Sequence, residues 1–150
     1  MSVLTKLFWD PTTKLLKKYE KELSAVAKYE AEFADSVKTV EDVQKKTQEF
    51  KNAFDPIRTA RDARLQEIES DESLALGEIN LRRGETMNTY HLDRVHKIRE
   101  IRPQVLALHR RASQIVMEQE FKLTTGEKYV WEMIPYDVQL VGAMALDEGN

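Results

Sequence analysis

The chain has 150 residues, enough for one domain with a hydrophobic core, and 33% of them are charged. Its formal net charge is −3 with both signs interspersed, so the sequence does not favour nucleic acid as a partner. The absence of cysteine excludes disulfide bonds and thiolate metal sites and agrees with a cytoplasmic location. No apolar run approaches the roughly 20 residues of a membrane-spanning helix.

The start of the chain, residues 1–18 (Met1 to Lys18), combines apolar and aromatic side chains at helical spacing with nearby lysines. Such an amphipathic segment can lie on an acidic phospholipid surface or in the groove of a partner protein. The same residues can equally pack against the rest of the domain. Both interpretations stay open on the sequence alone.

Two amphipathic helices follow. Residues 11–34 carry apolar side chains at intervals of three and four, which predicts a helix with one buried face. A polar break at residues 35–39 leads to a second predicted helix over residues 40–54, with Val43, Thr47, Phe50 and Phe54 on one face.

Residues 57–99 are highly charged, with a narrow apolar stripe typical of one or two long helices. We expect a helical hairpin or coiled-coil-like insertion here, with a break at Arg83-Gly84. Another helix is predicted over residues 101–118, with Pro103 in its first turn, where a missing N–H costs nothing.

The last part of the chain contains the predicted β-structure and a final helix. Residues 121–131 alternate apolar with polar on either side of Thr125-Gly126, which predicts a small β-hairpin. After Pro135, Asp137 is the expected cap of a helix that contains the densest apolar run in the chain.

No catalytic or metal-binding residues are predicted. The three histidines, His91, His96 and His109, have spacings of five and thirteen that bring no two onto one helical turn. The carboxylates are scattered among lysines and arginines, as on a solvated helix face.

One stretch has a specific resemblance. Met133-Ile-Pro-Tyr-Asp-Val-Gln-Leu-Val-Gly-Ala-Met-Ala-Leu-Asp-Glu-Gly149 resembles the adenine-recognising Q motif of SecA, the ATPase motor of bacterial preprotein translocation. Ala143 stands where that family usually has a second glycine. Leu7-Phe-Trp-Asp-Pro11 and Val43-Gln-Lys-Lys-Thr-Gln-Glu-Phe-Lys51 are similar to other family segments, and they occur in the family's order. The hairpin and the charged insertion resemble SecA proteins of the Bacteroidetes type.

The resemblance implies an adenine-binding role for three residues. Gln139 would hydrogen-bond the adenine edge, because its amide both donates and accepts, and Met133 and Tyr136 would pack against or beside the base. Outside this motif, a glutamine in an apolar helix is most often a surface residue, and this interpretation stays open together with the adenine-binding role.

The resemblance also implies a fold class, a division of the chain into segments, and a function. The fold class would be mainly α with one small β-hairpin, as the amino-terminal portion of an α/β P-loop helicase-like motor domain. We expect residues 1–56 to form the first helices of the motor, residues 57–100 the insertion, and residues 101–150 the helix, hairpin and Q motif. The complete motor would use ATP with Mg²⁺ to move preproteins through a SecY-type channel, at the cytoplasmic face of the inner membrane.

The sequence contains no glycine-rich loop ending in Gly-Lys-Thr, which holds the nucleotide phosphates in such motors, so the 150-residue chain alone is expected to be inactive as an ATPase. The sequence leaves open whether the chain forms a homodimer. The alternative is a non-enzymatic helical adaptor or coiled-coil interaction protein, which would explain the charge and the long helices. It does not explain the block from Tyr136 to Gly142.

Overall fold

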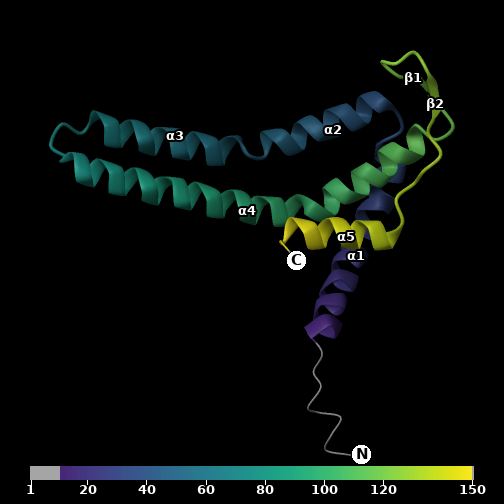
Figure 1. The fold of residues 1–150 in the computed structure, drawn as a ribbon, viewed down its shortest axis with the longest axis horizontal. Coiled ribbons are helices and arrows are strands. Elements are labelled where there is room, and N and C mark those ends of the chain that lie inside the picture. Colours follow the sequence, from purple (N-terminus) through teal and green to yellow (C-terminus); the bar gives the residue numbers. More distant parts are fainter. Residues whose placement is uncertain (1–10, 150) are drawn as a thin grey trace, which may run out of the picture. The chain divides into compact units, whose positions relative to one another are not determined.

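The structure is a computed structural model that describes residues 11–149. It contains five helices and one hairpin within that range: α1 (Pro11–Ser36), α2 (Val40–Asn52), α3 (Asp55–Ser70), α4 (Leu76–Ile115), β1 (Glu120–Lys122), β2 (Lys128–Val130) and α5 (Asp137–Asp147) (Figure 1). The mainly α fold class with one small β-hairpin is therefore confirmed.

The chain packs as two compact units. One consists of Met1–Val43 together with Leu106–Asn150, and the other of Gln44–Val105. The first unit contains α1, the end of α4, the β-hairpin and α5, and the second is built mainly from α3 and the larger part of α4. The domain boundaries predicted at residues 56 and 100 stay a prediction.

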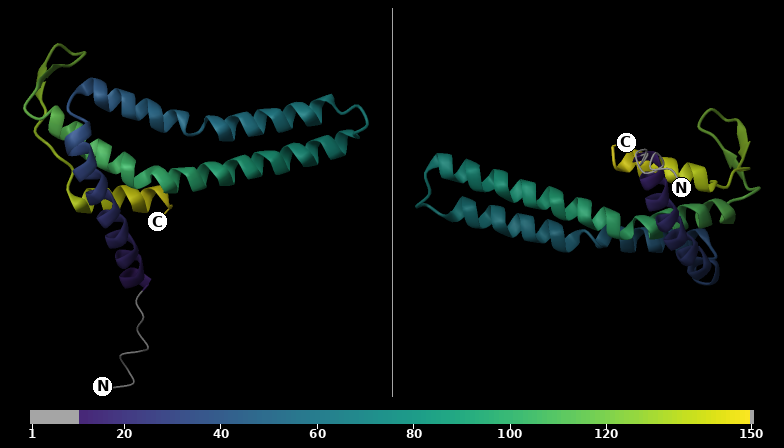
Figure 2. Two further views of the ribbon diagram at one scale, coloured as in Figure 1. Left: turned by 180° about the vertical axis from the view of Figure 1, so that it is seen from behind. Right: turned by 90° about the horizontal axis from the view of Figure 1, so that it is seen from below.

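The core of the first unit is built on a single stripe of α1. Tyr19, Val26 and Phe33 are spaced by seven residues, so they lie on one face of the helix, and each is at most 2% exposed. The helix packs against α5 (Figure 2). Leu140 and Met144 of α5 are also buried. Apolar burial along this stripe thus joins the beginning of the described chain to its end.

The start of α2 is fixed by local polar chemistry. The N–H of Asp42 donates to the Thr39 hydroxyl at 3.2 Å, and the Asp42 carboxylate accepts from the N–H groups of Lys38 and Thr39 at 2.9 and 3.0 Å. This reciprocal arrangement satisfies donors that the first turn of a helix otherwise leaves unpaired. The polar break predicted at residues 35–39 is confirmed.

The second unit contains the predicted helical hairpin, but its turn is not where the sequence analysis expected it. The prediction of a break at Arg83-Gly84 was wrong, because α4 runs through Gly84 without interruption. The chain turns instead after α3, where the carboxylate of Asp71 accepts from the N–H and hydroxyl of Ser73 at 3.1 and 2.5 Å. These bonds hold the pKa of Asp71 below its ordinary value. A glycine inside a helix costs only about 1 kcal/mol, whereas this side-chain turn competes directly with helix continuation.

The prediction of a separate helix that begins near residue 101 was also wrong, because α4 continues through this position. Pro103 lies inside α4 rather than in a first turn. The proline removes one backbone hydrogen bond, yet the helix continues into the buried Ala107 and Leu108. Burial beyond the proline therefore outweighs the lost bond. The end of the helix was also predicted a few residues late: α4 ends at Ile115, and Glu118 has a φ of 63° that leads the chain into β1.

The predicted β-hairpin is confirmed. β1 and β2 pair antiparallel with Phe121 opposite Tyr129. The loop turns at Gly126, which has a φ of 89°, and its N–H donates to the carbonyl of Leu123 at 2.9 Å. A left-handed glycine at the end of a three-residue loop matches the right-handed twist of the two strands.

The role of Met144 in the α1–α5 packing can be tested by truncation. Met144 is fully buried, so we expect Met144→Ala to lower the free energy of unfolding by about 2–5 kcal/mol through lost burial and a cavity. Leu146→Ala is the matched control on the same helix, since Leu146 is 78% exposed and its loss should cost less than about 0.5 kcal/mol. Urea denaturation followed by circular dichroism measures both. Equal effects of the two substitutions would contradict this account of the core.

Candidate adenine-binding site

The three residues predicted to contact adenine lie together around the start of α5. Met133 and Tyr136 belong to the extended segment that enters the helix, and Gln139 lies in its first turn. All three side chains are accessible: Met133 is 50% exposed, Tyr136 is 72% exposed, and Gln139 is also classed as exposed. A ligand could therefore reach each of them without any rearrangement of the described residues.

Gln139 makes two contacts that hold its amide in place. Its Oε1 accepts a hydrogen bond from the backbone N–H of Tyr136 at 2.8 Å, and its Nε2 lies 4.0 Å from the Sδ of Met133. The first bond satisfies an orphan donor at the helix start, as the third residue of a capping box does. It leaves the second lone pair of Oε1 and the N–H groups of Nε2 able to meet a ligand.

The same hydrogen bond corrects one detail of the sequence analysis. Asp137 was predicted to cap the helix, but the N-cap residue is Tyr136, and Asp137 is the first residue inside α5. The physical reason is that Gln139 reaches back to the Tyr136 N–H and so places the helix start one residue earlier.

Asp137 instead takes part in a charged bridge between three helices. Arg110 of α4 donates to Asp137 of α5 and to Glu30 of α1, both at 2.7 Å. The Arg110 side chain is only 14% exposed, whereas that of Asp137 is 70% exposed and that of Glu30 is 28% exposed. This bridge was not predicted from the sequence, because Arg110 lies 80 residues from Glu30 and 27 from Asp137.

The other end of α5 is held by a second charged contact. The carboxylate of Glu148 accepts from the Nζ of Lys18 at 2.5 and 2.6 Å and from the Tyr19 hydroxyl at 3.3 Å. The Glu148 side chain is only 9% exposed, so this pair is shielded from water on one side. Polar bonds thus fix α5 to its neighbours near both of its ends, and so fix the position of Gln139.

The segment before α5 is attached to the hairpin. The indole Nε1 of Trp131 donates to the carbonyl of Met133 at 2.6 Å, and the Trp131 backbone pairs with Gln119 at 3.1 Å. Trp131 therefore connects the end of β2 to the first of the three candidate residues. An aromatic donor at this position restricts the path of the chain into Tyr136.

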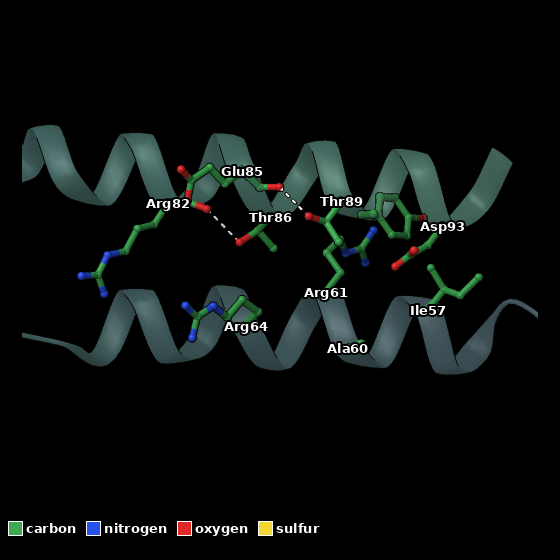
Figure 3. Close-up of a pocket in the computed structure, with 10 residues that line it drawn as sticks. Ile57, Ala60, Arg61, Arg64, Arg82, Glu85, Thr86, Thr89 and Asp93 are labelled. Atoms are coloured by element: carbon green, nitrogen blue, oxygen red, sulfur yellow. Dashed lines mark hydrogen bonds between the residues drawn. The ribbon is translucent and has the colours of Figure 1, made fainter. Parts of the chain in front are cut away.

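A cavity of about 300 Å³ lies between α3 and α4, in the second unit (Figure 3). The guanidinium of Arg61 lies over the ring of Tyr90 at 4.5 Å, and the lining arginines form ion pairs with neighbouring carboxylates. Thr86 and Thr89 turn their hydroxyls back to carbonyls of their own helix at 2.8 and 3.0 Å. The three arginines and two threonines of the lining are thus already engaged, and the cavity is an open groove of a charged helical hairpin.

The described residues contain no group of three or more His, Asp or Glu side chains arranged to hold a metal ion. His91, His96 and His109 are all exposed on α4. Within residues 11–149, no helix is both long enough and apolar enough to cross a lipid bilayer.

Comparison with known families identifies the class of this domain. Residues 4–150 match a family model of helicase-like, DEAD-type domains. That model is described as the SecA DEAD-like domain, and because it covers almost the whole chain, the chain belongs to the SecA family. The resemblance stated from the sequence is thus confirmed.

A curated relative agrees with this assignment. The chain is 32% identical over 81 residues to the protein translocase subunit SecA of Pelodictyon phaeoclathratiforme, an alignment that covers 49% of this chain. It covers only 8% of that relative, so the chain corresponds to a small part of the relative's length. No solved structure matches significantly. The family match also accounts for the block from Tyr136 to Gly142, which a helical adaptor left unexplained.

The charged bridge can be measured with double-mutant cycles that use Arg110→Met, Glu30→Gln and Asp137→Asn. The methionine keeps an apolar stem, so each cycle isolates the polar term. We expect a coupling energy of about 1–3 kcal/mol between Arg110 and the less exposed Glu30. The coupling between Arg110 and the exposed Asp137 should be below about 1 kcal/mol. Urea denaturation supplies the free energies of unfolding, and the reverse order of the two couplings would contradict the burial argument.

Proposed function

We propose that this chain forms the amino-terminal part of a SecA-type motor that uses ATP, and that Met133, Tyr136 and Gln139 contact the adenine base. Two observations support the proposal. The family model matches almost the whole chain. The three side chains that an adenine site requires lie together and exposed around the start of α5, with Gln139 held in a defined orientation.

The chemistry of these residues fits a purine base. Adenine presents an amino donor beside a ring-nitrogen acceptor, and the Gln139 amide can accept from the first and donate to the second. The thioether of Met133 and the ring of Tyr136 offer polarizable and aromatic surface to a flat base. The described residues thus fit the base of the nucleotide.

The phosphates and Mg²⁺ would require other residues. The 150-residue sequence contains no Gly-Lys-Thr or Gly-Lys-Ser, so its own side chains contribute to base recognition rather than to phosphoryl transfer. Bound ATP supplies the free energy that a translocase converts into movement. In the complete motor the partners are a SecY-type channel and preproteins, and the location is the cytoplasmic face of the inner membrane.

The test of adenine recognition is Gln139→Ala in a version extended through the phosphate loop and the rest of the motor. We expect weaker ATP binding and a preference for ATP over GTP narrowed by about 1–2 kcal/mol, because guanine presents a carbonyl where adenine presents an amino group. Equilibrium titrations with both nucleotides measure the difference. Unchanged affinities for ATP and GTP would contradict the assignment.

Two further variants separate recognition from helix capping. Gln139→Glu keeps an acceptor for the Tyr136 N–H but loses the amide donor, so it should preserve the helix start and impair ATP binding at least as much as alanine. Val138→Ala changes a neighbouring side chain that is 74% exposed and should affect neither property. If Gln139→Ala unfolds the protein while Gln139→Glu binds ATP normally, Gln139 has a structural role only.

We also propose that the start of the chain contacts acidic phospholipids. Residues 1–10 lie outside the described residues, while Lys14, Lys17 and Lys18 are exposed at the beginning of α1. Clustered lysines beside apolar side chains favour an anionic membrane surface.

Vesicle co-sedimentation tests this proposal. We expect deletion of residues 1–10, or Lys14→Gln with Lys17→Gln, to weaken binding to anionic vesicles and to reduce its sensitivity to salt. Lys18 is left intact in these variants because its loss would also break the pair with Glu148. Binding that is unchanged in both variants would show that the segment has another role.

A further inference from the structure

The β-hairpin has one apolar face that nothing in the described chain covers. Because residues directly opposite each other point to the same side, Phe121, Leu123, Tyr129 and Trp131 share a face. Phe121, Leu123 and Tyr129 are 39%, 43% and 46% exposed, and the rings of Tyr129 and Trp131 meet edge to face at 6.4 Å. Every residue of both strands is exposed.

The backbone of the hairpin also has two unpaired edges. Within the described residues the sheet has only two strands. The N–H of Trp131 donates to the carbonyl of Gln119 at 3.1 Å, and the N–H of Leu123 donates to the carbonyl of Glu127 at 2.8 Å, so these two pairs are hydrogen-bonded positions. Since such positions alternate along an antiparallel pair, the N–H and C=O groups of Glu120 and Lys122 point outward from β1. Two-stranded sheets are marginal in water and are stabilised by a third strand.

The face of the hairpin opposite the apolar one carries two lysines, of which one forms an ion pair and the other does not. Lys128 of β2 forms an ion pair with Glu120 at 2.8 Å. Lys122 of β1 has no ion-pair partner among residues 11–149, although it lies directly opposite Lys128. An acidic side chain on a strand beside β1 would neutralise this uncompensated cation.

From these three features, we propose that the β1 edge binds a separate polypeptide as an added antiparallel strand. The bound segment is extended, with apolar side chains at alternate positions. Of the side chains between them, the one opposite Lys122 is acidic and the one opposite Glu120 is uncharged, because a second carboxylate would repel Glu120. Its apolar residues continue the face of Phe121 and Leu123, and an acidic residue lies beside Lys122. Its backbone pairs with the outward groups of Glu120 and Lys122, as in other cases of strand addition. This inference does not depend on nucleotide binding.

The first experiment uses the 150-residue chain and the short capped peptide Val-Glu-Val-Thr-Val, whose glutamate lies opposite Lys122 and whose threonine lies opposite Glu120. In the proposed register the N–H groups of the glutamate and the threonine face β1, so N-methylation of these two residues should abolish binding, while N-methylation of the valines should leave it unchanged. Amide chemical shifts should move at Glu120 and Lys122 and much less at Lys128 and Val130. Any other pattern of N-methyl effects, or larger shifts on β2, would overturn the proposal.

The second experiment tests the charge. Lys122→Glu should weaken binding of the same peptide by about two- to fivefold, and a peptide with lysine in place of glutamate should restore it. Lys45→Glu, on the exposed surface of α2, is the matched control and should have no effect. Failure of the charge exchange to restore binding would overturn the proposal, as would concentration-dependent pairing of the chain with itself through β1 in the absence of peptide. Neither result would bear on ATP recognition by Gln139.

Discussion

The arrangement of the first unit depends on the apolar burial of α1 against α5, to which a bridge made by Arg110 adds a polar contact. One guanidinium joins Glu30 of α1 to Asp137 of α5, and it does so from α4, so three helices meet at a single side chain. Arginine suits this role because its planar fork presents donors in several fixed directions. The neighbouring Arg111 donates to the carbonyl of Val37 at 2.8 Å, just beyond the end of α1. Adjacent arginines on α4 therefore hold two different points of the chain around α1.

The consequence for the candidate site is that α5 is positioned by polar contacts and by burial together. Leu140 and Met144 face inward, while Val138 and Gln139 face outward on the same helix. The bridge at Asp137 and the pair at Glu148 restrict rotation about the helix axis, which would otherwise exchange these faces. The exposure of Gln139 follows from the burial of Leu140 and Met144, and these polar contacts add to it.

Local sequence signals predicted most of the elements, because those elements depend on near neighbours. Apolar side chains at intervals of three and four, Tyr19, Val26 and Phe33 among them, were enough to predict α1. The alternation on either side of Thr125-Gly126 was enough to predict the hairpin. The break predicted at Gly84 and the helix start predicted near Pro103 were wrong. Each residue weakens a helix locally, but the helix persists through contacts elsewhere along α4. The Arg110 bridge could not be predicted, because it connects positions far apart in the sequence. For the site, the motif located the three residues, but only the structure revealed that Gln139 also caps its own helix.

The contact between α1 and α5 has a consequence for the order of events during synthesis. Lys18 and Glu148 are separated by 130 residues, so the apolar stripe of α1 leaves the ribosome long before Leu140 and Met144 exist. At typical elongation rates of about 5–20 residues per second, this interval lasts several seconds or more. During that time the nascent α1 can be covered only by other surfaces, including a chaperone or the ribosome itself. The hairpin of α3 and α4, whose partners are close in sequence, has no such delay.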